Sequence, residues 1–397
     1  AFVVPVDAVV VEVLGRSVGW SALLPPRCCC DARRGAQAII DEDRKWREKN
    51  ALQKQLQQEG EGLANSSVDD FTIEGVSCEF DFGQFVQCTH KKTRREYVLK
   101  AFGKAKAVQL CVEARVLAEK AILADMVAPH PFVPLSLAHF ADGSYLYTCY
   151  KLKVAMDLAQ LLSSVTFDEA TAQFYVASIM CGVQHLHDNA IVYRGLRPEG
   201  ICIDEAGQVQ LMDLRYAVKL DHAAPPRDYC GLPEYLSPEQ VSGQGHSFPV
   251  DYWQLGVLTY EMLAGQSPFL TGDAAKDSEV AMYGRISAHQ FGGIKCPSEF
   301  SPAFESVINE LLHPTADARI GCRGGGAEEL RNHDWFEHVN FEEMLRGAAK
   351  APYVATQACA EAVKKYVSAG VAAALPSAPY DDVDSKFTEF ASFTRKK

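Results

Sequence analysis

The chain has 397 residues, of which 48% are hydrophobic and 23% are charged, a balance that is typical of globular proteins and excludes disorder throughout. Its 51 acidic and 39 basic residues give a net charge of −12, so we do not expect the basic surface of a nucleic-acid-binding protein. No apolar run reaches the ~18 residues that cross a bilayer, and we expect no membrane insertion.

The cysteines indicate a reducing compartment. There are 13 of them, an odd number without paired C-x-x-C spacing, so reduced thiols in the cytoplasm are a better interpretation than a disulfide or zinc framework. The adjacent Cys28, Cys29 and Cys30 could bind a metal or carry a lipid. Three neighbouring side chains converge poorly on one ion, however, and we predict no functional role for them.

The first 70 residues divide into two segments. Residues 1–30 begin without Met, in the middle of a Val-rich, strand-like pattern, so we expect the chain to be a fragment of a longer protein. Residues 31–70 are strongly charged and contain a Gln-rich stretch before Gly60 and Gly62. This composition favours an exposed helix that links two domains.

The rest of the chain separates into two parts with different periodicity, followed by a tail. Residues 71–150 show short strands around one helix, and residues 151–336 show mainly helical periodicity. Residues 337–397 are Ala-rich, then acidic, and end near the sequence FTEFASF. We expect this last segment to wrap on the body of the protein.

An ordered series of motifs carries a family resemblance. Lys100 ends the strand-like YVLK and Glu119 lies in the helical stretch that follows, and such a pair aims a lysine at nucleotide phosphates in protein kinases. Further along stand YRGLRPEGICID (193–204), MDLR (212–215), CGLPEYLSPE (230–239), DYWQLGVLTYEMLAGQSPF (251–269) and DARIGC (317–322). In this order they resemble the catalytic loop, metal-binding loop, activation segment and C-lobe core of AGC-class serine/threonine kinases, specifically the cyclic-nucleotide-dependent kind.

The resemblance implies an α+β, bilobal protein-kinase fold. A small β-rich N-lobe would comprise residues 71–150, a larger helical C-lobe residues 151–336, and an AGC-type C-terminal tail residues 337–397. We expect Phe387 and Phe390 of the tail to dock in an apolar groove beside the N-lobe helix.

Residues 1–30 look like the last strands and helix of a cyclic-nucleotide-binding domain, which points to the cGMP-dependent type. The alternative is a strand and helix packed on the kinase body. Cyclic nucleotide could bind only if an upstream domain exists, because Ala1 falls after the phosphate-binding cassette that such a domain would contain.

Three catalytic positions depart from the family pattern. Gly195 stands at the aspartate that orients the substrate hydroxyl, Arg197 at the lysine that contacts the transferred phosphoryl group, and Gly200 at the asparagine that binds the second metal ion. The glycines offer no side chain, and Arg197 keeps the charge with a different geometry. We therefore predict that the catalytic residues are degenerate.

Only some of the residues that bind the nucleotide in the family are present in this sequence. The resemblance makes Lys100, Glu119, Asp157 and Asp213 cofactor-binding residues, with one metal ion at most, on Asp213. Arg215 replaces a glycine and could reach Asp213 and neutralise it. At the three glycine positions of the phosphate-binding loop stand Cys78, Phe80 and Gly83, with Asp81 between the last two, and Phe85 and Val98 replace smaller residues around the adenine.

These changes predict no firmly held cofactor, weak ATP binding at most, and an incomplete magnesium site. The interpretation favoured by the residues is that the surviving ionic groups hold the two lobes together.

Six residues match structural positions of the class. Asp228 stands where a phosphothreonine is expected, facing Arg194 and Arg115, so we expect an activation segment anchored without phosphorylation. Glu239 and Arg319 match a buried ion pair, and Asp251 matches an acid that caps the catalytic-loop backbone.

The sequence therefore predicts a pseudokinase that is not an enzyme and acts as a scaffold or regulatory binding module among protein partners in a larger assembly. The alternative is a low-activity serine/threonine kinase that transfers the γ-phosphate of ATP to protein hydroxyls, with Arg197 and Asp213 serving beside a displaced base. A regulatory subunit responsive to cyclic nucleotide is a third interpretation. We expect a cytoplasmic location, and some relatives of this class suggest a cilium or flagellum.

Overall fold

The computed structural model describes residues 11–13, 16–18, 29–80, 83–126, 128–221, 224–289, 293–354, 387 and 390. The chain divides into two compact units, Ala1–Leu52 and Gln53–Lys397. In the first unit, β1 (Val11–Val13) pairs antiparallel with β2 (Arg16–Val18), and α1 (Cys29–Leu63) begins. Most of the predicted cyclic-nucleotide-binding remnant, including Cys28, lies outside the described residues.

The last turns of α1 are exposed on one side, as the charged composition predicts, but their other side packs on the sheet of the N-lobe. Gly60 makes this approach possible, because a Cβ at its position would lie 2.6 Å from the carbonyl oxygen of Leu137. The preceding Glu59 is 8% exposed and accepts a hydrogen bond from the hydroxyl of Tyr97 at 2.7 Å. Its carboxylate also pairs with Lys151 at 2.6 Å, so this buried charge is compensated.

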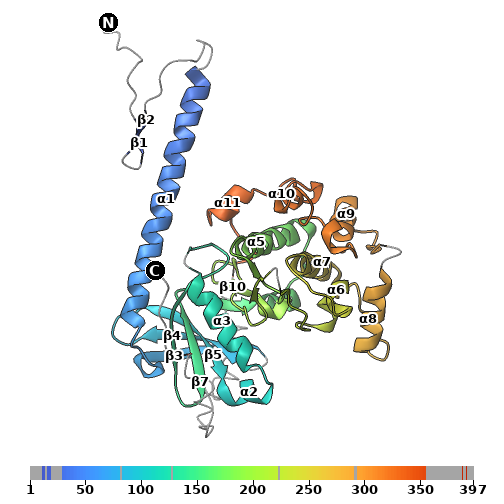
Figure 1. The fold of residues 1–397 in the computed structure, drawn as a ribbon, viewed down its shortest axis with the longest axis horizontal. Helices are drawn as coiled ribbons and strands as arrows, with labels where there is room; N and C mark the ends of the chain where they lie inside the picture. The colour runs from blue at the N-terminus through green and yellow to red at the C-terminus, as the bar shows by residue number, and fades with distance from the viewer. Residues whose placement is uncertain are drawn as a thin grey trace. The chain divides into compact units, whose positions relative to one another are not determined.

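The N-lobe is a five-stranded antiparallel sheet in the order β3-β4-β5-β7-β6 (Figure 1). Its elements are η1 (Val68–Asp70), β3 (Phe71–Phe80), β4 (Gly83–His90), β5 (Glu96–Gly103), α2 (Lys104–Gln109), α3 (Glu113–Asp125), β6 (Ser136–Ala141) and β7 (Tyr145–Tyr150).

Strand β5 is buried on both faces, and its side chains alternate between two cores. Tyr97, Leu99 and Ala101 pack with Leu63 of α1, whereas Val98 and Phe102 point to the opposite face. Lys100 shares that opposite face because it lies two residues from each of them.

The C-lobe is mainly helical. Its helices are α4 (Leu158–Ser164), α5 (Glu169–Asp188), η2 (Pro198–Gly200), η3 (Pro233–Tyr235), α6 (Pro238–Val241), α7 (Pro249–Ala264), α8 (Glu279–Ala288), α9 (Pro302–Leu311), η5 (Ala316–Ala318), α10 (Ala327–Arg331), η6 (Asp334–Phe336) and α11 (Phe341–Leu345). Its short strands are β8 (Val154–Asp157), β9 (Ile191–Val192), β10 (Cys202–Asp204), β11 (Val209–Gln210) and β12 (Val218–Lys219). No helix in the described part of the chain is both long and apolar enough to span a membrane.

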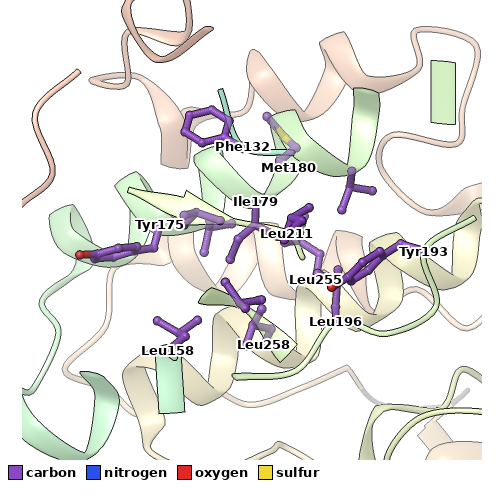
Figure 2. Packing of buried hydrophobic residues seen from close by; sticks show 14 of the residues in the cluster. Phe132, Leu158, Tyr175, Ile179, Met180, Tyr193, Leu196, Leu211, Leu255 and Leu258 are labelled. Carbon is purple, nitrogen blue, oxygen red and sulfur yellow. The ribbon is translucent and has the colours of Figure 1, made fainter. Parts of the chain in front are cut away.

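The C-lobe core forms where α5 and α7 pack against each other. Figure 2 shows Ile179 and Met180 with Leu255 and Leu258, and Leu211 lies among them. Helix α7 is apolar around most of its circumference and is accordingly buried on nearly all sides. The observed architecture, a β-sheet lobe joined to a helical lobe, is the α+β bilobal fold that the resemblance predicts.

The tail residues Phe387 and Phe390 lie in the apolar groove that the sequence predicts. They are 3% and 1% exposed and pack with Phe102, Val116 and Leu146, which come from β5, α3 and β7. Nothing more of the tail beyond residue 354 belongs to the described residues.

Candidate active site

A buried ion cluster lies between the lobes, with Lys100 at its centre. Lys100 has no exposed surface, and its Nζ lies 2.5 Å from Oε1 of Glu119 and 3.2 Å from Oδ1 of Asp213. The same ammonium donates to the carbonyl oxygen of Met212 at 3.0 Å. Strand β5, helix α3 and the segment after β11 therefore bring together three of the four nucleotide-site residues predicted from the sequence.

Arg215 holds both carboxylate oxygens of Asp213. Its Nε lies 2.6 Å from Oδ1 and its Nη2 lies 2.6 Å from Oδ2, while Nη2 of Arg197 lies 3.8 Å from Oδ2. Burial alone would raise the pKa of Asp213, but Arg215, Lys100 and Arg197 outweigh it and hold that pKa well below its usual range. The carboxylate is thus ionised and fully engaged with cations.

The pKa of Glu119 is shifted in the opposite direction to that of Asp213. Its pKa is raised, first by burial and then by the negative charge of Asp213, although Lys100 opposes both effects. Its second oxygen, Oε2, has no hydrogen-bond partner within the described part of the structure.

Aromatic rings surround the cations of this cluster. The Nζ of Lys100 lies 5.5 Å, 5.8 Å and 4.8 Å from the ring centroids of Phe80, Phe85 and Phe102, within the range of cation–π contacts. The Phe80 ring also lies 4.7 Å from the guanidinium carbon of Arg215. A Cβ at Gly83 would come within 2.4 Å of that ring, so the loop strand and Phe80 lie tightly together above the cations.

The slot expected for an adenine ring is filled with side chains. Cys78, Phe85, Val98, Tyr150, Met156 and Cys202 are all buried in the same apolar cluster as the C-lobe core. The hydroxyl groups of Tyr150 and Tyr193 are buried there without a hydrogen-bond partner among the described residues, and burial raises the pKa of both well above the usual value. A nucleotide can enter only after these side chains separate.

The catalytic loop keeps its backbone shape without the usual aspartate. Asp251 accepts hydrogen bonds from the backbone N–H groups of Tyr193 and Arg194, at 2.8 Å and 2.6 Å, and Arg194 adopts a left-handed φ of 58°. A Cβ at Gly195 would lie 3.3 Å from the ring of Tyr216, and one at Gly200 would lie 3.2 Å from the carbonyl oxygen of Gly195. The two glycines are therefore closely packed.

The predicted activation-segment anchor forms only in part. Nη1 of Arg194 lies 2.6 Å from Oδ1 of Asp228. Burial would raise the pKa of Asp228, but the hydrogen bond and charge of Arg194 lower it. Arg115 does not join this pair, contrary to our expectation: it donates to the carbonyl oxygen of Tyr229 at 3.3 Å and lies over the ring of Tyr216 at 5.0 Å.

A second ion pair joins the activation segment to the C-lobe. Nη1 and Nη2 of Arg319 each lie 2.6 Å from a carboxylate oxygen of Glu239. Arg319 is fully buried and also donates to the carbonyl oxygens of His313 and Pro249.

A comparison with known families identifies the family to which the chain belongs. The model of the protein kinase domain matches residues 80–336. The chain belongs to the protein kinase family. A cAMP-dependent protein kinase catalytic subunit of Dictyostelium discoideum is 33% identical over 274 residues, and a catalytic subunit-like protein of Caenorhabditis elegans is 32% identical over 278 residues. Each match covers 69% of this chain, but 40% and 66% of the respective relative.

A further relative, the cAMP-dependent protein kinase catalytic subunit PRKX of Mus musculus, is 33% identical over 293 residues, which cover 73% of this chain and 79% of that protein.

These relatives correct the expectation that the chain is not an enzyme. That expectation is wrong, because the kinase domain matches and the relatives are named as catalytic subunits of kinases. A kinase domain implies binding of ATP and magnesium in general, so our doubt about magnesium is not confirmed. The finer assignment to the cGMP-dependent type stays a prediction.

The chain also has an acidic pocket, and of its lining residues the sequence predicted only Asp157 as a site residue. A cavity of about 310 Å³ is lined by Glu79, Asp157, Ala159, Gln160, Ser163 and Glu199. Burial and the charge of Glu199 raise the pKa of Asp157 to about 6. Glu261 likewise has a raised pKa, from burial and from the charges of Glu199 and Glu234. The only sequence signal was the acid in RPEG, directly beside the catalytic loop.

The residues of the site do not fit a pair of magnesium ions. Magnesium prefers oxygen ligands in an octahedral arrangement, yet both oxygens of Asp213 are bound by Arg215 and Gly200 contributes no side-chain ligand atom. Within the described ranges, no group of three His, Cys, Asp or Glu residues is placed to hold a metal ion.

Proposed function

We propose that the protein is an ATP-dependent serine/threonine protein kinase that transfers the γ-phosphoryl group to hydroxyls of protein substrates at a low rate. The observation that carries the proposal is the buried contact of Lys100 with both Glu119 and Asp213, in a chain whose family consists of protein kinases. This contact fixes an ammonium group where the phosphates of ATP are held in such enzymes.

The remaining residues support positioning and charge neutralisation. Phosphoryl transfer passes through a loose transition state, so that catalysis depends mainly on alignment and on cations near the phosphoryl oxygens. Glu119 orients Lys100, and Arg197 supplies a second cation beside Asp213. The substrate oxygen attacks the γ-phosphorus while the bond to ADP breaks.

Gly195 accounts for the low rate. It has no carboxylate to receive the hydroxyl proton, which therefore leaves to water. The loss of a positioned base typically costs about 10²–10⁴-fold in rate.

The site must open before it can bind ATP. Phe80 covers Arg215 and Lys100, and the adenine slot is filled by Cys78, Phe85 and Cys202. The burial of these side chains favours the closed state, since separating them exposes apolar surface to water. We therefore expect weak ATP binding as well as slow transfer.

The acidic pocket supports basic protein segments as substrates. Asp157 and Glu199 line this pocket, and Glu199 lies in η2, directly after the catalytic loop. Carboxylates crowded together are relieved of their mutual repulsion when a cation binds between them. An arginine or lysine close to the acceptor hydroxyl would supply that cation.

The proposal is tested by transfer of labelled phosphate from ATP to an arginine-rich peptide with a single serine. We expect slow incorporation by the full chain and none by Lys100→Met, with Lys276→Met, a change of an exposed lysine, as the matched control. Incorporation that survives Lys100→Met would come from another enzyme, and no incorporation by the unaltered chain would contradict the proposal.

The other expectations rest on the cysteine pattern, for the cytoplasm, and on the family resemblance, for the partners and for a cilium or flagellum. A role among protein partners in a larger assembly, and a cytoplasmic, ciliary or flagellar location, stay proposals. Co-purification of a tagged chain from its own cells, compared with Lys276→Met as a surface variant, would identify such partners.

A further inference from the structure

We propose that the guanidinium of Arg215 replaces the magnesium ion on Asp213, so that this kinase binds ATP without a divalent cation. The inference rests on the proposed function, because it presupposes that ATP enters the site. The proposed function requires only that ATP binds. This inference requires in addition that ATP binds equally well with and without a divalent metal ion.

The first support is the geometry of the Asp213 carboxylate. Its oxygens accept from Nε and Nη2 of Arg215, both at 2.6 Å, which is the strong bidentate form of an arginine–carboxylate contact. Arg215 is only 1% exposed, so the pair is shielded from water and salt. A metal ion would have to displace a buried, doubly hydrogen-bonded cation from this carboxylate.

The second support is the charge of the cluster. Three cations and two carboxylates share the site, which gives it a formal charge of one positive unit. These residues are Lys100, Arg197, Arg215, Glu119 and Asp213. A divalent cation added to such a site is repelled in a buried environment, whereas a triphosphate, which is strongly anionic, is attracted.

The third support comes from residue 200, where a second metal ligand would stand. Gly200 has no side-chain ligand atom, and a Cβ at its position would lie 3.3 Å from Cγ and 3.7 Å from Nε of Arg197. The side chain of Arg197 therefore borders the position at which a ligand side chain of residue 200 would begin. A cation, and not a side-chain oxygen, lies beside Asp213 there.

The chemistry of a guanidinium suits this role. It carries five N–H donors in one plane and stays protonated at physiological pH, so it can bridge a carboxylate and a phosphate as a metal ion does. The ring of Phe80, 4.7 Å from the guanidinium carbon, and that of Tyr216, 5.5 Å away, hold its plane in place.

The test is calorimetric titration of ATP into the full chain, once with EDTA and once with magnesium. We expect the two dissociation constants to agree within about threefold. Tight binding with magnesium and none with EDTA would overturn the inference and leave the proposed function standing. No binding in either buffer would overturn both.

Arg215→Gly separates this role from a merely structural one. We expect the variant to bind ATP at least about tenfold more tightly with magnesium than with EDTA, because Asp213 is then open to the metal. Arg215→Gln, which keeps the first three side-chain carbons and a hydrogen-bond donor without the charge, serves the same purpose if the glycine variant does not fold. Arg346→Ala, a change of an exposed arginine directly after α11, is the control and should match the unaltered chain. An Arg215 variant that folds and still binds ATP equally well in both buffers would overturn the inference.

Discussion

Asp228 and Arg194 tie the activation segment to the catalytic loop. The carboxylate of Asp228 accepts a hydrogen bond from Nη1 of Arg194 at 2.6 Å, and Nε of Arg194 donates to the carbonyl oxygen of Tyr216 at 2.7 Å. His246 lies beside the same guanidinium at 3.2 Å. A permanent charge thus holds a segment that phosphorylation orders in related enzymes.

Asp228→Ala should loosen this segment. The side chain of Asp228 is half exposed, so solvent screens the pair and we expect a loss of at most about 1 kcal/mol in local stability. Faster amide hydrogen exchange between residues 216 and 239 is the expected result. Asp273→Ala, a change of a half-exposed acid in the loop before α8, should leave that exchange unchanged.

The pH dependence of this anchor follows from the lowered pKa of Asp228. A carboxyl whose pKa is lower in the folded state stabilises that state fully above its unfolded pKa, near 3.9, and loses the effect as the pH falls through the folded value. The contribution of Asp228 to exchange protection in the segment should therefore be constant at neutral pH and decline only below about pH 4. Equal protection in Asp228→Ala and the unaltered chain would contradict the anchor.

Glu59→Ala should destabilise the N-lobe. Removal of this carboxylate leaves the hydroxyl of Tyr97 and the ammonium of Lys151 without their partner, and a buried donor left unsatisfied costs about 1–3 kcal/mol. Urea denaturation measures the free energy of unfolding. Glu61→Ala provides a matched control two residues further along α1, where the side chain is exposed, and should change that free energy by less than about 0.5 kcal/mol. Equal effects of the two changes would refute a docking role for Glu59.

Binding of a basic peptide should weaken as the pH falls through about 6. Asp157 has its pKa raised to about 6 by burial and by Glu199, so it loses its negative charge below that pH and attracts a cation less. The KM for an arginine-rich peptide should rise accordingly, and Asp157→Asn should flatten the profile around pH 6.

Asp168→Asn is the matched control for this profile. Asp157 and Asp168 both accept a backbone N–H at the start of a helix, from Gln160 and Thr171 respectively, and asparagine preserves such a cap. The pKa of Asp168 is lowered rather than raised, so its variant should keep the inflection. A profile that persists in Asp157→Asn would assign the titration to another group.

Much of the site could be predicted because motif order fixes which residues meet. Lys100, Glu119 and Asp213 are far apart in sequence, but each stands in a segment whose place in the fold is set, and the short spacing of Asp213 and Arg215 allowed their contact to be anticipated. Phe387 and Phe390 were predictable for a similar reason, as an aromatic pair at the end of a polar tail.

The remaining features depend on packing that spacing does not encode. Glu59 resembles its charged neighbours in sequence, and only the close approach at Gly60 buries it. Arg115 lies one helical turn before Glu119. Its side chain nevertheless contacts the ring of Tyr216 and the carbonyl oxygen of Tyr229 instead of Asp228. The expectation that the chain is not an enzyme gave too much weight to three departing positions and too little to the whole series of motifs, which the protein kinase domain matches over residues 80–336.

Gly195→Asp should accelerate phosphoryl transfer. The backbone of Gly195 does not have a positive φ, so a side chain is tolerated there, and its Cβ would lie 3.3 Å from the Tyr216 ring, which must shift by a few tenths of an ångström. A carboxylate at this position can accept the hydroxyl proton, and we expect kcat with the basic peptide to rise by about a hundredfold.

The same substitution at another glycine provides the control for this prediction. Gly143→Asp adds the same carboxylate in the turn between β6 and β7, where no atom lies within 4 Å of a Cβ, so it tests the effect of charge alone and should leave kcat unchanged. If Gly195→Asp folds and transfers phosphate no faster than Gly143→Asp, the missing base does not limit the rate. The opening of the site, in which Phe80 separates from Lys100 and Arg215, would then be the limiting step, since it precedes any proton transfer.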